Sequence, residues 1–154
     1  MSSADSVAQL TLDSFGNGRI GVIKATALNT TGNAVVSIPI LGGGLTNANA
    51  TVGSGSVIVR RITVQNATGS VSSANVSITT SSDGNASNAV VANVVLSNLT
   101  GAGKYQDLTI AGAYGANTAV TGYQTQALYI NVNTASGNAN VVDIAVYGDV
   151  VSFY

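Results

Sequence analysis

The sequence contains no cysteine, no histidine and no tryptophan, and only 7% of its 154 residues are charged. Without cysteine or histidine the chain has no disulfide, no thiolate or imidazole metal site, and no nucleophile paired with a histidine base. Five cations and six aspartates, with no glutamate, give a net charge of −1. That balance offers no basic patch for nucleic acid or an anionic membrane. We therefore expect no catalytic, cofactor-binding or metal-ligating residue, and a structural or binding protein rather than an enzyme.

The shortage of charge also predicts a partner. Soluble monomers usually depend on interspersed surface charge to resist association, whereas the cores of protein interfaces are depleted in charge. A surface of amides, hydroxyls and small apolar groups is easily desolvated. We expect the protein to contact copies of itself or a larger assembly; the alternative is a monomer from a source with biased composition.

What the chain is rich in predicts an all-β fold. Val, Ile and Thr, whose branched side chains favour strands, make up nearly a third of the sequence. Alternating apolar and polar residues recur between glycine and asparagine turns, as in half-buried strands. This pattern predicts one β-sandwich or jelly-roll-like domain of about 8–9 antiparallel strands. The expected strands are residues 7–12, 20–28, 34–40, 56–66, 71–80, 89–96, 108–111, 127–133 and 141–153.

The chain is expected to consist of an arm and one domain. Residues 1–14 are predicted as a loose N-terminal arm containing the first strand, and residues 15–154 as a single β domain. Within it, residues 42–55 are rich in Gly and Asn and are predicted as a flexible loop. Asn17 and Gly18 are typical of a hairpin turn between the first two strands. Pro39 lacks a backbone donor, so we expect it at a sheet edge or strand end.

The sequence also bears on targeting. Its start has no basic segment followed by an apolar one. No apolar run approaches the ~18 residues that span a bilayer. We expect a protein made in the cytoplasm without a signal peptide.

Two glycine motifs resemble nucleotide-binding loops but lack the required context. Residues 16–21 fit G-x-G-x-x-G, yet a strand rather than a helix is expected after them, so a hairpin turn is the better interpretation. Residues 101–104 (GAGK) miss the first glycine of a phosphate-binding loop, where Asn98 stands, and Tyr105 replaces its Ser or Thr. The aspartates fall in no catalytic or calcium-loop motif.

Arg60 and Arg61 are the only adjacent cations. Strand alternation is expected to send them to opposite faces, one toward solvent or a partner and the other toward an acid or carbonyl groups. Two interpretations remain open. Either they anchor a neighbouring subunit, or they are a surface arginine and an arginine at the rim between two sheets.

Tyr105, Tyr114 and Tyr123 recur every nine residues in a glycine-rich segment. Exposed tyrosines would stack on sugars or form an interface hot spot. Buried tyrosines would be the large residues of a core otherwise short of aromatics. The scarcity of other aromatics favours the core.

Two segments resemble small structural proteins of tailed bacteriophages. Residues 58–70 (IVRRITVQNATGS) resemble a strand and turn of the form R-I-x-V-x-N-A-[ST]-G-S. Residues 128–132 (LYINV) and 141–149 (VVDIAVYGD) resemble the closing strands of these proteins. The resemblance spans roughly residues 57–151, although the Gly-Gly of related sequences is missing after Ser70. It implies a head decoration, or cement, protein: a small β domain, often trimeric, that lies on the outer capsid and bridges neighbouring subunits.

These features favour a non-enzymatic virion protein that stabilises the capsid from its outer surface. Its expected partners are itself, as a homotrimer, and the major capsid protein, with no nucleic acid and no membrane. One alternative is a fibre or adhesin domain of a virion that binds a host glycan or receptor through the tyrosines. Another is a polysaccharide depolymerase that uses aspartate pairs. The candidate partner contacts are Val7, Leu10, Leu12, Arg60, Arg61, Tyr105, Tyr114 and Tyr123.

Deleting residues 1–12 is expected to weaken capsid binding while the β domain stays folded, because terminal segments often become ordered on a partner. Co-sedimentation of the truncated chain with purified heads measures retention, and circular dichroism controls for folding. Unchanged retention would contradict the role given to the arm.

Overall fold

The computed structural model describes residues 16, 18–40, 56–110 and 127–151. Within this part of the chain it contains eight strands and one short 3₁₀ helix, η1. The elements are β1 (Gly18–Ala27), β2 (Gly32–Pro39), β3 (Ser56–Gln65), β4 (Asn75–Thr79), η1 (Ala86–Asn88), β5 (Ala89–Val95), β6 (Gln106–Leu108), β7 (Ala127–Thr134) and β8 (Val141–Val151).

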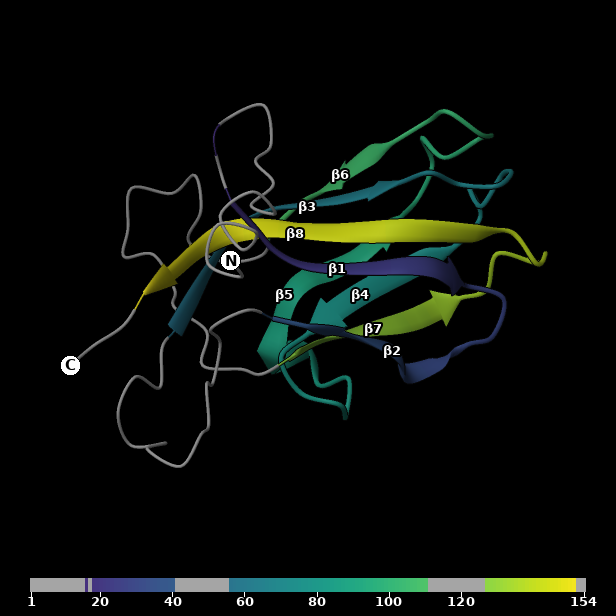
Figure 1. The fold of residues 1–154 in the computed structure, drawn as a ribbon. Helices are drawn as coiled ribbons and strands as arrows, with labels where there is room; N and C mark the ends of the chain where they lie inside the picture. The colour runs from purple at the N-terminus through teal and green to yellow at the C-terminus, as the bar shows by residue number, and fades with distance from the viewer. Residues whose placement is uncertain (1–15, 17, 41–55, 111–126, 152–154) are drawn as a thin grey trace.

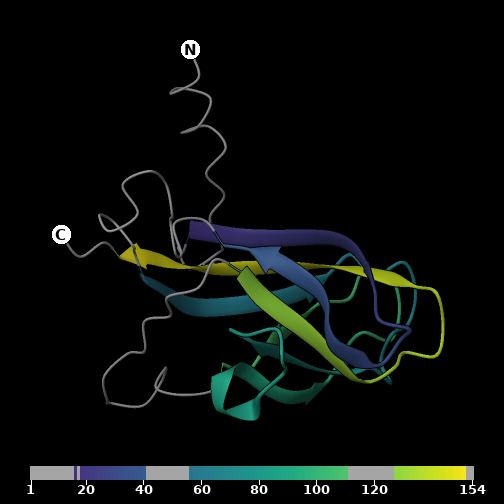
Figure 2. The same cartoon turned by 90° about the horizontal axis from the view of Figure 1, so that it is seen from below.

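The strands form two four-stranded antiparallel sheets that pack face to face (Figure 1). Sheet A has the order β1-β8-β3-β6, and sheet B has the order β2-β7-β4-β5. The pairing is nested: β1 pairs with β8, β2 with β7, β3 with β6, and β4 with β5. A long antiparallel ribbon rolled into two sheets in this order is a jelly roll. The predicted all-β sandwich is therefore confirmed. In the view of Figure 2, β7 runs obliquely to β8, as expected for two twisted sheets.

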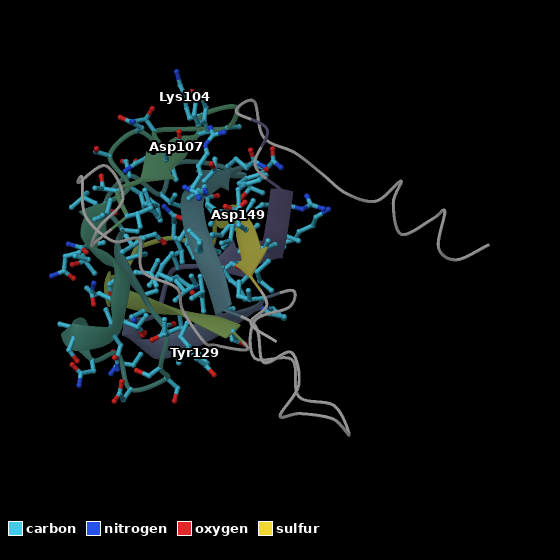
Figure 3. All side chains as sticks on the ribbon, turned by 90° about the vertical axis from the view of Figure 1, so that its left-hand side faces the viewer. Lys104, Asp107, Tyr129 and Asp149 are labelled. Atoms are coloured by element: carbon cyan, nitrogen blue, oxygen red, sulfur yellow. The ribbon has the colours of Figure 1, made fainter. Side chains whose placement is uncertain are left out.

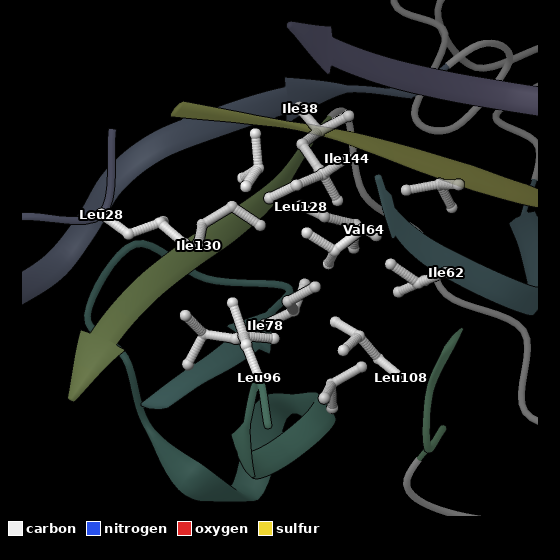
Figure 4. Close-up of a cluster of buried hydrophobic side chains, with 14 of the residues drawn as sticks. Leu28, Ile38, Ile62, Val64, Ile78, Leu96, Leu108, Leu128, Ile130 and Ile144 are labelled. Atoms are coloured by element: carbon white, nitrogen blue, oxygen red, sulfur yellow. The ribbon is translucent and has the colours of Figure 1, made fainter. Parts of the chain in front are cut away.

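The core between the sheets is wholly aliphatic. Every residue of the buried cluster is Ala, Val, Leu or Ile, and Figure 4 shows side chains of both sheets meeting in it. Alternation along the strands supplies them, since Val76 and Ile78 of β4 and Leu128 and Ile130 of β7 point inward with two-residue spacing. These positions exclude water from both inner faces, so the burial of branched aliphatics stabilises the sandwich.

The predicted strand boundaries hold within two residues for β1, β2, β3, β5, β7 and β8. Pro39 ends β2, which is an edge strand of sheet B, so its predicted position is confirmed. The expected first strand at 7–12, the arm at 1–14 and the flexible loop at 42–55 lie outside the described residues. So does Asn17 of the predicted hairpin turn.

Two strand predictions were wrong. The expected strand 71–80 shortens to β4, because residues 71–74 form a turn in which the Ala74 N–H donates to the Val71 carbonyl (3.0 Å). The expected strand 108–111 is replaced by β6, which begins at Gln106. Pairing of Asp107 with Thr63 of β3 determines this register, and neither turn nor pairing is visible in periodicity.

Four connections gather at one end of the sandwich, which we call the loop end. The Ser136 N–H donates to the Leu28 carbonyl (2.8 Å), and the Val71 N–H donates to the Leu99 carbonyl (2.9 Å). Bonds of this kind join loops from different strand pairs and hold both sheets in place at this end. The loop end comprises residues 28–31, 66–74, 96–105 and 135–140.

Asp143 of β8 braces the strand beside it. β1 has an irregularity between Ile23 and Thr26, where Ala25 adopts φ 53°. The Ala25 N–H donates to Asp143 Oδ1 (2.9 Å), and Asn66 Nδ2 donates to Asp143 Oδ2 (2.9 Å). One carboxylate thus links β1, β8 and the end of β3.

Gly148 is required by a close approach of two backbones. It lies opposite Val59, beside the bulge in β3, and a Cβ there would overlap the carbonyl oxygen of Ile58. Gly148→Ala is expected to lower the free energy of unfolding by about 1–3 kcal/mol, as overpacking does. Urea denaturation measures the change. Gly101→Ala is the matched control, because no atom lies within 4 Å of the added methyl group; equal midpoints for both variants would contradict the assignment.

Candidate functional site

Of the eight candidate partner contacts, only Arg60, Arg61 and Tyr105 lie in the described part of the chain. The other five, Val7, Leu10, Leu12, Tyr114 and Tyr123, lie outside it. The three that are described do not form one site. The arginines belong to β3, whereas Tyr105 precedes β6 at the loop end.

Each of the two arginines has an aspartate partner. Arg60 Nε lies 2.7 Å from Asp149 Oδ2, and Arg61 Nε lies 2.9 Å from Asp107 Oδ1. Val59 pairs with Gly148 and Arg61 with Tyr147, so the strand has a bulge at Arg60. The bulge removes the strict alternation behind the prediction of opposite faces, and neither arginine joins the core cluster. Exposed ion pairs of this kind contribute about 0–1 kcal/mol each.

The aspartates of the described chain all have hydrogen-bond partners within the fold. Asp107 Oδ1 also accepts from Thr63 Oγ1 (2.7 Å), and Asp143 braces β1 as described above. Asp83 Oδ1 accepts from Ser81 Oγ (2.6 Å) and from the Asn85 N–H (3.0 Å). These bonds assign the four carboxylates of this part of the chain to positioning strands and turns.

Charge is distributed unevenly between the two sheets. Of the nine charged residues that the structure describes, seven belong to the strands of sheet A; Lys104 is in the β5–β6 connection, and Asp83 is in the β4–β5 connection. The four strands of sheet B contain no charged residue. In Figure 3, Lys104, Asp107 and Asp149 lie on the side of sheet A, and Tyr129 marks sheet B. The strands of sheet B are therefore uncharged, and Asp83, whose backbone carbonyl accepts from Asn33 Nδ2 of β2 (3.0 Å), is the one described charge beside them.

The outer surface of sheet B is polar, but its polar groups bond to each other. Asn131 Nδ2 donates to Ser77 Oγ (3.3 Å) and Thr79 Oγ1 (3.1 Å). Asn133 Nδ2 donates to Asn93 Oδ1 (2.6 Å), and the Ala34 N–H donates to Asn131 Oδ1 (2.8 Å). Asn131 and Thr79 are already buried (1% exposed each), and the exposed Asn133 bonds within the sheet, so covering this surface costs little further desolvation. We call Asn75, Ser77, Thr79, Asn93, Asn131 and Asn133 the amide face.

The sequence held part of the information for this face. Alternating segments such as NVSIT of β4 and LYINVN of β7 show amides and hydroxyls between core residues. Which strands share a sheet, and hence that the uncharged strands come together, depends on the nested pairing. Sequence reasoning therefore missed the amide face.

A solvent-open depression lies at the β5–β6 connection. It has a volume of about 690 Å³ and is lined by Asn98, Thr100, Lys104, Tyr105 and Asp107, among others. Tyr105 is 61% exposed. The prediction that favoured a core position was therefore wrong for this tyrosine, because aliphatic side chains fill the core on their own.

Comparisons with known protein families, with curated proteins and with solved structures find no match to this chain. Within the described ranges, no three acidic residues cluster in a way that could hold a metal ion. The same part of the chain has no helix long and apolar enough to cross a membrane. What bears on function is therefore the geometry of the two sheets and their loops.

The pKa of Asp83 is expected below its ordinary value of 3.8, because Ser81 Oγ and the Asn85 N–H donate to the ionised carboxylate. A lowered native pKa stabilises the fold above the unfolded pKa, and this stabilisation is lost as pH falls through the native pKa. Ser81→Ala should move the pKa of Asp83 back toward 3.8. An NMR titration of the Asp83 carboxyl carbon measures it, with Ser82→Ala as the neighbouring control; a pKa that does not respond to Ser81→Ala would contradict this cause.

Proposed function

We propose that this chain is a non-enzymatic virion protein that decorates a capsid and stabilises it by bridging neighbouring subunits. The jelly roll supports this proposal because viral capsid proteins use the fold, although lectins use it as well. Fold alone does not define function, so the choice between these roles depends on the chemistry of the protein surface.

The observation that carries the proposal is the absence of charged residues from the four strands of sheet B, beside which Asp83 is the one described charge. Interface cores are depleted in charge, and an ionised group buried without a partner is costly. On the amide face, the exposed Asn133 already donates to Asn75 and Asn93 within the sheet, and Asn131 is itself buried. A neighbouring subunit can therefore cover this surface without leaving buried polar groups unsatisfied. The ion pairs of Arg60 and Arg61 then remain on the side facing solvent.

Stabilisation of the shell would follow from mass action. A protein that binds only the assembled capsid stabilises it by RT ln(1 + [L]/Kd), about 2.7 kcal/mol per site at 100 times Kd. Association of three copies would add avidity, because several weak contacts then engage the shell together. The chain itself needs no reactive group for this role.

Placing charge on sheet B is expected to release the protein from capsids. Ser37 on β2 and Val95 on β5 are exposed at the two edges of this sheet. The double variant Ser37→Lys and Val95→Lys would force two cations into the interface, and retention on heads should fall by about tenfold or more, equivalent to about 1.4 kcal/mol. Co-sedimentation with stripped heads, followed by quantitative gel analysis, measures the retained fraction.

The matched control adds the same charge to the other sheet. Ala27→Lys with Gln65→Lys changes β1 and β3 of sheet A and should leave retention unchanged. Equal loss in both variants would point to bulk electrostatics instead of a sheet B interface. Sedimentation velocity of the unmodified chain then tests the oligomer, since a trimer has three times the 15.3 kDa of one chain.

A further inference from the structure

We propose that the depression at the β5–β6 connection binds a neutral oligosaccharide. This inference goes beyond capsid decoration and does not depend on it, because the residues involved lie outside the amide face. The proposed contacts are Tyr105 as a stacking surface, and Asn98, Thr100, Lys104 and Asp107 as hydrogen-bonding groups.

The size and composition of the depression fit such a ligand. Its volume of about 690 Å³ falls within the range of about 300–1,000 Å³ typical of small-molecule sites. Most such sites have a predominantly apolar lining, whereas this one combines a single aromatic ring with amide, hydroxyl, ammonium and carboxylate groups. A ligand with many hydroxyl groups and one apolar ring face matches that lining.

Tyr105 is the large aromatic side chain that remains exposed in the described part of the chain. It is 61% exposed, and Val95 is the other exposed large hydrophobic residue of the described chain. An amphipathic ring held in this way can pack against the CH groups of a sugar while the tyrosine hydroxyl stays in contact with water. Packing of the fold does not require this position, because the core cluster includes no aromatic residue.

The connection that carries Tyr105 is fixed by the residue next to it. Gln106 is 9% exposed; its Oε1 accepts from the Asn98 N–H (3.0 Å) and its Nε2 donates to the Val95 carbonyl (3.0 Å). Leu96 and Leu99 anchor the same connection in the core. The site is therefore formed before a ligand arrives, which reduces the entropic cost of binding.

The two charges of the lining are of opposite sign and sum to zero, which suits a neutral sugar. Lys104 brings one positive charge, and Asp107 brings one negative charge that is held by Arg61 (2.9 Å). Figure 3 shows Lys104 and Asp107 on the same side of the molecule, close to β6. Lys104 can donate to sugar hydroxyls and Asp107 can accept from them, so the two side chains together offer a neutral ligand both kinds of hydrogen bond.

The test is an NMR titration of the ¹⁵N-labelled full chain. The probes are three neutral trisaccharides (maltotriose, N,N′,N″-triacetylchitotriose and xylotriose) and one acidic trisaccharide, 3′-sialyllactose. We expect at least one neutral probe to give saturable shifts of the backbone amides of residues 97–107. Saturable shifts confined to other residues, shifts with the acidic probe alone, or no saturation with any neutral probe would overturn the proposal.

Variants separate stacking from an indirect effect on the loop. Tyr105→Ala should weaken binding by about tenfold, and Tyr105→Phe should retain most of it, because the ring remains. Lys104→Ala should also weaken binding. Its matched control is Lys24→Ala, which removes an exposed lysine of β1 outside the depression. Since Tyr105 is largely exposed, amide spectra of the free variants should match the unmodified chain away from the loop. Binding that survives Tyr105→Ala would also overturn the proposal.

Discussion

The pairing of β8 with both β1 and β3 is the constraint on which the rest of the structure depends. The last described strand lies inside sheet A, so this sheet is complete only when the two ends of the rolled ribbon meet. Gly148 allows the backbone of β3 to approach, and Asp143 secures the irregular part of β1. The nested order then brings β2 and β7 together in sheet B and determines which side chains share a face. Most contacts of such a fold are non-local, a property associated with slow folding.

A second consequence of this pairing is the separation of polar chemistry into three regions. Sheet A carries the ion pairs, sheet B carries amides and hydroxyls that bond to each other, and the loop end carries exposed Tyr105. A chain with so few charges has chemically distinct surfaces because the strands that contain the charges lie in one sheet. The association proposed for sheet B and the ligand binding proposed at the β5–β6 connection use different surfaces, so the two proposals are compatible in one molecule.

Much of the fold followed from the sequence, because alternation and branched side chains depend on local geometry alone. Six strands were bounded within two residues, and Pro39 was correctly placed at a strand end. β4 and β6 were misjudged, since a turn at residues 71–74 and pairing with Thr63 are tertiary effects. Tyr105 was expected in the core for want of other aromatics, yet branched aliphatics fill that space. The arginines were identified as adjacent cations. Their aspartate partners could not be, because Asp149 is 89 positions from Arg60 and Asp107 is 46 positions from Arg61, and no sequence pattern links residues so far apart.

By itself, the sequence determined that this protein is all-β and poor in charge, and that it has no histidine or cysteine for reactive chemistry. These properties depend on residue types and on spacing of two along a strand. Only the tertiary structure decided which strands share a sheet, and hence that sheet B is uncharged and that Gln106 holds Tyr105 in solvent. The physical reason is that strand pairing is non-local. Alternation along a strand determines which of its side chains are buried, but the strand with which it pairs depends on how the whole chain folds into two sheets.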